Sequence, residues 1–419
     1  MQQELIIEKQ RPKINGRPAE CRGGSKPKAG SKKNKERNIA AITIVLIIAA
    51  WLIGIYRENT DVEPYLHHAV PAADHIEKSE NGGFAAYSAD RLLGYVTIGE
   101  ASGYGGPMQL AVATDLKGKI TGLVMVGHLE TPRWFERVHN NGLISRLVGK
   151  NYSDAFDLNS DVDGVSGATY TSRGIANAVL NGSRHIAKEK LHFSVLPLAP
   201  AKVEFGLPEI TLIALFILGI VGRRRSFRHT KKMRWFCMLT GMIMLGFVYT
   251  NPLTISVLNK MLLGFWPDWH THLYWYLLIV GILFSVTAFN KNPYCEWFCP
   301  FGAAQECMGK IGGAKAHSIR SYQSQVKWLP RILALIAILI ALLYRNPGIS
   351  SYEIFGTLFD FEGNITQFFL LGLVLLASLF IHRPWCRYLC PIKPVESLIK
   401  LLKNWTKDLW LKIRHARKA

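Results

Sequence analysis

The sequence predicts an α-helical membrane protein of about six spans that carries one polar α+β domain. The 419-residue chain is 49% hydrophobic yet has a formal charge of +20, and its lysines and arginines stand mostly beside apolar runs. Its one large polar block, residues 57–205, lies between the first apolar run and the others. Basic flanks beside apolar runs are typical of membrane spans, whereas a nucleic-acid-binding protein carries its basic patch on a folded polar domain. We therefore expect contact with a lipid bilayer and none with nucleic acid.

The N-terminal region is expected to be a basic tail followed by an anchor. Residues 1–38 contain few apolar side chains to bury, so we expect them to stay unfolded in the cytoplasm. Residues 39–56 are almost entirely apolar and long enough to cross a bilayer. A cleaved signal peptide is the alternative, but its basic region would be unusually long and no small-residue cleavage site follows. Because positive flanks stay inside, an uncleaved anchor would place residues 57–205 in the periplasm.

Residues 206–394 are expected to form a five-span membrane domain. Its apolar runs are residues 205–221, 235–249, 273–289, 332–344 and 365–381. Basic residues fall on alternate connections, which the positive-inside rule assigns to the cytoplasm. Both termini would then be cytoplasmic, and residues 395–419 would form a basic amphipathic helix there. This arrangement is that of a multi-pass protein of the bacterial inner membrane.

The polar block has the pattern of a small α+β domain. Three stretches have strand composition: residues 93–98, 108–114 and 120–126. Residues 115–119 would connect the last two as a hairpin, and a helix is expected over residues 173–188. Just before this helix stands the segment 163–172, Asp-Gly-Val-Ser-Gly-Ala-Thr-Tyr-Thr-Ser. A helix start offers unpaired N–H groups and the positive end of the helix dipole to a phosphate, although a plain N-cap by Thr or Ser fits equally well.

The Ser-Gly-Ala-Thr part of this segment resembles the motif of the FMN-binding domains of bacterial membrane redox pumps, the Na⁺-translocating quinone reductase and Rnf subunits, and of NosR-type proteins. In those families a dedicated transferase joins the FMN phosphate to a threonine hydroxyl as a phosphoester. The resemblance implies a flavin site that includes Ser166, Gly167 and Ala168, with Thr169 as the acceptor. Thr171 stays open as a second acceptor. A periplasmic flavin transferase is implied as a partner.

A second segment, residues 128–132, His-Leu-Glu-Thr-Pro, resembles the Glu-Thr-Pro stretch of the same flavin domains. This resemblance adds Glu130 and Thr131 to the implied cofactor site. The glycine-rich continuation of the pump subunits is replaced by Arg-Trp-Phe at residues 133–135, so its contact with the isoalloxazine ring is not carried over. We expect His128 to be structural.

Two Cys-x3-Cys-Pro motifs follow similar intervals after two Tyr-x-Asn-Pro segments, residues 249–252 and 344–347. The motif cysteines are Cys295 and Cys299, then Cys386 and Cys390. Repeated helix pairs place equivalent residues at the same depth, so both motifs would meet at the cytoplasmic membrane surface. Cys-x3-Cys-Pro is the tail of the bacterial ferredoxin signature, and two pairs supply the four thiolates of an iron–sulfur cluster, with [4Fe–4S] favoured.

Other interpretations of the cysteines stay open. Four thiolates also suit tetrahedral zinc, whereas a disulfide is disfavoured in the reducing cytoplasm. Cys307 lies near the first pair and could add a ligand, and Cys21 and Cys237 carry no signal. His270 and His272 could ligate haem or line a quinone site, although histidines beside tryptophans are more typical of an interfacial aromatic belt.

The two motif types, in this order, resemble the NosR type, whose FMN domain precedes a membrane domain with paired Cys-x3-Cys-Pro motifs. NosR-type proteins continue into a cytoplasmic ferredoxin domain, and this sequence departs from them there. The resemblance implies electron transfer from a quinol or ferredoxin-like donor through the cysteine site and FMN to a periplasmic acceptor. A carrier would be needed across the roughly 30 Å of hydrocarbon. The alternative is a membrane redox sensor or assembly scaffold with a structural metal, and no catalytic residues stand out.

Overall fold

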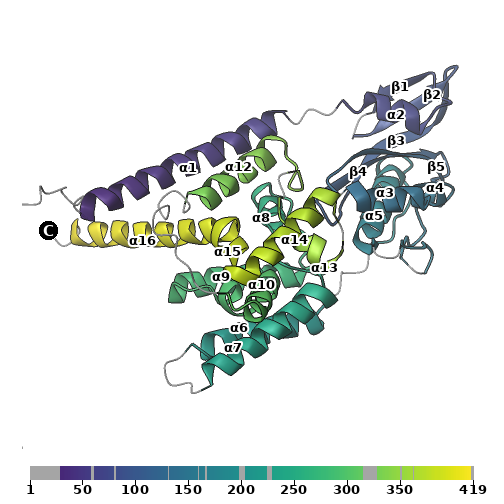
Figure 1. The fold of residues 1–419 in the computed structure, drawn as a ribbon. Coiled ribbons are helices and arrows are strands. Elements are labelled where there is room, and N and C mark those ends of the chain that lie inside the picture. Colours follow the sequence, from purple (N-terminus) through teal and green to yellow (C-terminus); the bar gives the residue numbers. More distant parts are fainter. Residues whose placement is uncertain are drawn as a thin grey trace, which may run out of the picture.

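The computed structural model describes residues 29–57, 61–79, 82–130, 132–158, 160–165, 168–197, 203–223, 229–314, 328–349, 352–361 and 363–416. A sheet-containing domain lies at one end of the molecule and a group of helices forms the rest (Figure 1). The sheet domain is inserted in the chain between α1 (Ala29–Arg57) and α6 (Leu207–Val221).

The described residues of the sheet domain form a five-stranded antiparallel meander in the order β1-β2-β3-β4-β5. Its strands are β1 (His75–Lys78), β2 (Phe84–Ser88), β3 (Arg91–Ser102), β4 (Pro107–Asp115) and β5 (Ile120–His128). The hairpin between β4 and β5 falls where the sequence predicts it. Oδ1 of Asp115 accepts hydrogen bonds from the N–H groups of Lys117 and Lys119, both at 2.8 Å, and Gly118 takes a positive φ of 77°.

The two faces of this sheet bury different helices. Alternate side chains of β4 point to opposite faces: Leu110 and Val112 pack with the face covered by α5 (Thr169–Glu189), and Ala111 and Ala113 pack beneath α2 (Glu63–Ala69). The close approach of β3 to α5 depends on Gly99, where a Cβ would lie 2.1 Å from the carbonyl oxygen of Ala178. Two short helices, α3 (Pro132–Asn140) and α4 (Leu143–Leu147), complete the domain.

The helical part begins with α1, which lies beside α12 and α16 (Figure 1). The remaining helices are α6, α7 (Thr230–Thr240), η1 (Gly241–Val248), α8 (Ile255–Leu262), α9 (Leu273–Phe289), η2 (Tyr294–Phe298), α10 (Pro300–Ile311), α12 (Leu329–Leu343), α13 (Phe355–Phe359), α14 (Ile365–Phe380), α15 (Pro384–Tyr388) and α16 (Ile392–Ala416). Because α1 starts at Ala29, the expectation of an unfolded tail through residue 38 is wrong for residues 29–38. Residues 1–28 lie outside the described part.

Membrane-spanning character is clearest for the first helix. Among the described residues, one helical stretch, Asn34–Arg57, is long and apolar enough to cross a bilayer. Four shorter apolar helices are Leu207–Val221, Leu273–Phe289, Leu329–Leu343 and Ile365–Phe380. The predicted run 235–249 is α7 continued by the π-helix η1. Six spans therefore stay a prediction.

Candidate cofactor sites

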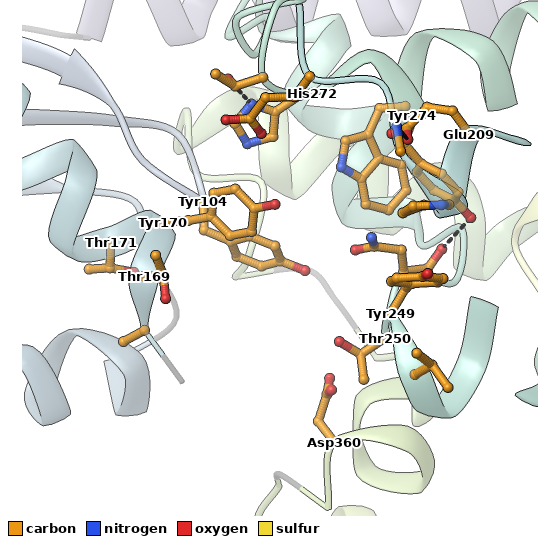
Figure 2. A pocket seen from close by; sticks show the side chains of 18 of the residues that line it. Tyr104, Thr169, Tyr170, Thr171, Glu209, Tyr249, Thr250, His272, Tyr274 and Asp360 are labelled. Atoms are coloured by element: carbon orange, nitrogen blue, oxygen red, sulfur yellow. Dashed lines mark hydrogen bonds between the residues drawn. The ribbon is translucent and has the colours of Figure 1, made fainter. Parts of the chain in front are cut away.

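A cavity of about 760 Å³ lies between the sheet domain and the helices. Figure 2 shows Thr169 and Thr171 on one side, and Tyr274 and Tyr249 on the side of the helices. Aromatic rings extend between the two sides: the rings of Tyr104 and Tyr170 are 6.3 Å apart, and Tyr170 lies 5.0 Å from the ring of His272. The cavity is thus walled by flat side chains and suits a planar ring system.

The two candidate acceptor threonines have different surroundings. Helix α5 begins at Thr169 rather than near residue 173, so both threonines stand in its first turn, where backbone N–H groups have no partner within the helix. Thr169 is exposed and lines the cavity. Thr171 is only 2% exposed, and its hydroxyl donates a 2.6 Å hydrogen bond to Oε2 of Glu130. The more accessible hydroxyl for a covalent attachment is that of Thr169.

The rest of the Ser-Gly-Ala-Thr segment is described in part. Ala168 is the buried N-cap residue of α5. Ser172 ties the segment to the helix: its Oγ accepts from the N–H of Val165 at 3.2 Å and donates to the carbonyl of Ala168 at 3.0 Å. Three predicted site residues lie outside the described part, namely Thr131, Ser166 and Gly167. A phosphate at this helix start would meet backbone donors, so the residues present fit an FMN phosphate.

Glu130 is a buried carboxylate beside the domain junction, which a hydrogen bond of Lys260 crosses. It is 5% exposed, and its Oε1 accepts a 2.7 Å hydrogen bond from the N–H of Gly105. Nζ of Lys260, on α8, donates to the carbonyl of Tyr104 at 2.7 Å. Burial raises the pKa of Glu130, against the effect of its hydrogen bonds and of Lys260. Burial also lowers the pKa of Lys260 to about 8. Sequence reasoning missed Lys260, although a lysine within an apolar helix is a signal.

The histidines divide into structural and cavity-lining ones. His128 stacks on Phe135 with ring centroids 3.7 Å apart, and burial lowers its pKa. Nδ1 of His270 lies 2.8 Å from Oδ1 of Asp268, and His270 does not line the cavity. His272 lines it. Burial lowers the pKa of His272 to about 4, so its imidazole is neutral near pH 7.

The four motif cysteines come together on neighbouring elements. Cys295 lies in η2 and Cys299 at the start of α10, while Cys386 lies in α15 and Cys390 precedes α16. Burial raises the pKa of all four thiols. Neighbouring thiolates of the set raise the pKa of Cys295, Cys299 and Cys390 further. Thiolates so placed need bound positive charge, which an iron–sulfur cluster supplies.

Amide groups donate to two of these sulfurs. Nδ2 of Asn292 lies 3.2 Å from Sγ of Cys295, and Nε2 of Gln305 lies 3.3 Å from Sγ of Cys386. Over the described ranges, no group of three or more His, Cys, Asp or Glu is arranged to hold one metal ion. A four-iron cluster places one thiolate on each iron and needs no three sulfurs around a common ion. The residues present fit such a cluster.

A charged network supports the cysteine site, and sequence reasoning missed it. Glu306 accepts two 2.7 Å hydrogen bonds from the guanidinium of Arg234 and pairs with Arg383. Nη1 of Arg383 donates in turn to the carbonyl of Cys295 at 3.0 Å. The network joins α7, α10 and α15. Glu306 stands two residues after the apolar stretch 300–304, and a carboxylate in that position was the sequence signal for this network.

The two halves of the cysteine site share local structure. Tyr294 and Trp385, which precede the first cysteine of each motif, are each 1% exposed. Thr250 and Arg345, in the two Tyr-x-Asn-Pro segments, take positive φ values of 50° and 48°. The two segments therefore turn in the same way.

Comparison with known proteins identifies both cofactor regions. Residues 103–183 match the FMN-binding domain family, which takes in Glu130 and Thr169. Residues 271–317 and 364–401 match the 4Fe-4S binding domain family, which takes in all four motif cysteines. The chain therefore carries an FMN-binding domain and an iron–sulfur-binding domain. Its cofactors are FMN and a 4Fe–4S cluster, as the sequence resemblance implied.

Several curated proteins are similar to parts of the chain. Protein NirI of Paracoccus denitrificans (strain Pd 1222) is 28% identical over 247 residues, which are 52% of this chain and 35% of the relative. The putative electron transport protein YccM of Escherichia coli (strain K12) is 30% identical over 30% of this chain and 38% of the relative. One subunit of the ion-translocating oxidoreductase complex of the same organism is 29% identical over 30% of this chain and 66% of the relative. The chain thus spans from about a third to about two thirds of these relatives.

Proposed function

We propose that this chain is a membrane electron-transfer protein that moves electrons between a cysteine-held iron–sulfur cluster and an FMN joined through its phosphate to Thr169. The observation that carries the proposal is the pairing of two redox-cofactor domains in one chain, with the exposed Thr169 facing a cavity walled by aromatic rings. A flavin exchanges one or two electrons and a cluster exchanges single electrons, so together they form a relay.

Membrane insertion is supported by apolar side chains that face outward. Val45 on α1 is 64% exposed and Phe369 on α14 is 72% exposed, and both have many exposed apolar neighbours. A continuous apolar surface of this kind is unfavourable in water and favourable in lipid. We propose six spans in the bacterial inner membrane, formed by α1, α6, α7 with η1, α9, α12 and α14. In this topology the FMN-binding domain, residues 57–205, is periplasmic.

The proposed partners follow from this topology. A flavin transferase in the periplasm would attach the FMN, and a periplasmic reductase or other acceptor would receive the electrons. The donor would be a quinol or a ferredoxin-like protein. Names of relatives support redox partners of this kind, since one is called a putative electron transport protein and another belongs to an oxidoreductase complex.

Intact mass and in-gel flavin fluorescence test the flavin attachment. The full chain is produced with and without a flavin transferase, beside Thr169→Ala and Thr171→Val. We expect wild type and Thr171→Val to gain the mass of one FMN less water, and Thr169→Ala to gain none. If only Thr171→Val fails to gain the mass of FMN, Thr171 is the acceptor. No gain in any sample would remove the covalent flavin from the proposal.

A second measurement tests the cysteine site. Iron, acid-labile sulfide and zinc are determined on the anaerobically purified chain, and four irons with four sulfides are expected. Zinc in place of iron would support the scaffold interpretation.

A further inference from the structure

A second cavity of about 780 Å³ adjoins the first one. The two share lining residues, namely Tyr104, Trp134, His272, Trp275 and Asp360. The second cavity extends between the loop of Tyr104 and the helices, where apolar side chains of α8 such as Val257 and Met261 line it. Its remaining walls include the polar side chains of Lys260 and Glu353. A ligand here would lie next to the flavin cavity and against the membrane helices.

Two polar atoms on the walls of this cavity have no hydrogen-bond partner among the described residues. One is Oε1 of Glu353, and the other is Nε2 of His272. Glu353 is 6% exposed, and its other oxygen, Oε2, accepts a 2.6 Å hydrogen bond from the N–H of Ile255. A buried polar atom without a hydrogen bond destabilises the folded chain, so each of these two atoms requires a partner from outside the described residues.

The chemistry of these two groups restricts the ligand. Burial raises the pKa of Glu353 to about 8, so near pH 7 its carboxyl carries a proton and can donate a hydrogen bond. The imidazole of His272 is neutral, and Nδ1 lies 2.8 Å from the hydroxyl of Thr271. The cavity therefore offers two uncharged hydrogen-bonding groups. A neutral ligand with two separate oxygen atoms satisfies both groups without introducing a charge.

We propose that the second cavity binds the ring of a membrane quinone or quinol, with Glu353 and His272 hydrogen-bonded to its two ring oxygens. The flat aromatic walls, Trp134 and Trp275 among them, suit the ring, and the apolar side of α8 suits an isoprenoid substituent. The proposal rests on the proposed function, because the adjoining cavity would hold the flavin. Tyr352, next to Glu353, donates a 2.9 Å hydrogen bond to the carbonyl of Leu389, next to Cys390, so the quinol ring would lie near both the flavin cavity and the cysteine site.

Electron exchange at this site balances as follows. Oxidation of a bound quinol breaks its two O–H bonds and yields the quinone. An FMN held at Thr169 in the adjoining cavity would take up the two electrons and two protons released. Nε2 of neutral His272 can accept a proton in transit. No carrier has to cross the membrane for this step.

Photo-crosslinking with a short-chain azido-ubiquinone tests the site on the full chain in detergent. Labelled peptides are mapped by mass spectrometry, and affinity is measured from the quenching of tryptophan fluorescence by decylubiquinone. We expect labels on α8 or on residues 352–361. Each lost hydrogen bond is worth about 1.4 kcal/mol, so Glu353→Leu and His272→Phe should each weaken binding about tenfold. Labels absent from both α8 and residues 352–361 would overturn the proposal.

Matched variants guard against simple misfolding. Glu353→Gln keeps an acceptor for the N–H of Ile255 and gains an amide donor for the ligand, so it should bind nearly as well as wild type. His270→Phe, two residues from His272 and outside both cavities, should also bind normally. Equal affinity in Glu353→Leu, His272→Phe and wild type would overturn the proposal.

The mass of attached flavin is recorded on the same samples. Quinone binding without attached flavin would uphold the site and reject the covalent flavin of the proposed function. Attached flavin without quinone binding would uphold the covalent flavin and reject the quinone site.

Discussion

Glu130 and Lys260 interact electrostatically across the junction of the sheet domain and the helices, and a double-mutant cycle measures that coupling. Glu130→Gln removes a buried negative charge that accepts hydrogen bonds from Gly105 and Thr171. Lys260→Met removes the ammonium that donates to the carbonyl of Tyr104 while keeping an unbranched apolar side chain. Both changes act on the loop 103–106, the segment of the sheet domain that contacts α8.

The size of the effect follows from the two hydrogen bonds of Glu130. A hydrogen bond to a charged group contributes about 1.5–3 kcal/mol and a neutral one about 0.5–1.5 kcal/mol, so Glu130→Gln should cost roughly 2 kcal/mol. Lys260→Met removes the donor to the carbonyls of Gly103 and Tyr104 but also removes a buried ammonium, so its net cost should be about 1 kcal/mol. Since each charge partly compensates the other, the double variant should lose about 1 kcal/mol less than the sum.

Hydrogen exchange read by mass spectrometry is the suitable assay, because it reports the opening of one loop and does not require the two domains to unfold in one step. The amide of Gly105 is itself a donor to Glu130. Its exchange reports local opening, and a loss of about 2 kcal/mol corresponds to roughly 30-fold faster exchange in Glu130→Gln. Peptides from β4 and β5 serve as the internal control. Unchanged exchange of the loop, or strictly additive effects in the double variant, would refute the coupling.

Three further predictions concern other parts of the chain. Burial raises the pKa of Glu353 from 4.5 to about 8, so the folded chain holds a proton that the unfolded chain releases. The thermal midpoint of wild type should therefore fall, relative to that of Glu353→Gln, between about pH 5 and pH 8, and a constant difference would contradict this. Gly99→Ala would bring a methyl group 2.1 Å from a carbonyl oxygen of α5 and should cost about 1–3 kcal/mol by overpacking. Gly372→Ala meets nothing within 4 Å and should leave the midpoint unchanged, so equal midpoints for both alanine variants would reject the close-packing argument. Cys299→Ser should abolish bound iron and visible absorbance while Cys307→Ser keeps both, and equal iron loss in the two variants would place Cys307 among the ligands.

Three of the five described strands, β3, β4 and β5, were predicted because their signals are local, whereas β1 and β2 were missed. Alternating apolar residues in β4 and the Asp-Leu-Lys-Gly-Lys turn after it are sufficient to define a hairpin. The start of α5 was placed too late because Thr169 and Thr171 have weak helix propensity. Helix formation there is supported by a distant residue, since Thr171 is hydrogen-bonded to Glu130, 41 positions earlier. A local sequence pattern cannot predict a hydrogen bond between residues that are 41 positions apart.

The same limit applies to the helical part. The cysteine motifs predict the ligands of the cluster, but Arg234 and Gln305 enter the site only through tertiary packing. The π-helix η1 was also unforeseen. A Cβ on Gly241, its first residue, would lie 2.3 Å from the carbonyl oxygen of Phe298. This close approach depends on where η2 packs, which the sequence of η1 alone does not specify.

The insertion of the sheet domain between α1 and α6 has a consequence for how its contact with the helices forms. Both ends of the domain are covalently joined to helices, so the domain cannot leave as a separate subunit would. Docking becomes an intramolecular equilibrium governed by an effective concentration, which for short tethers is in the millimolar range. A contact too weak to hold two free proteins together is therefore sufficient here. The strength of this docking is therefore independent of the concentration of the protein.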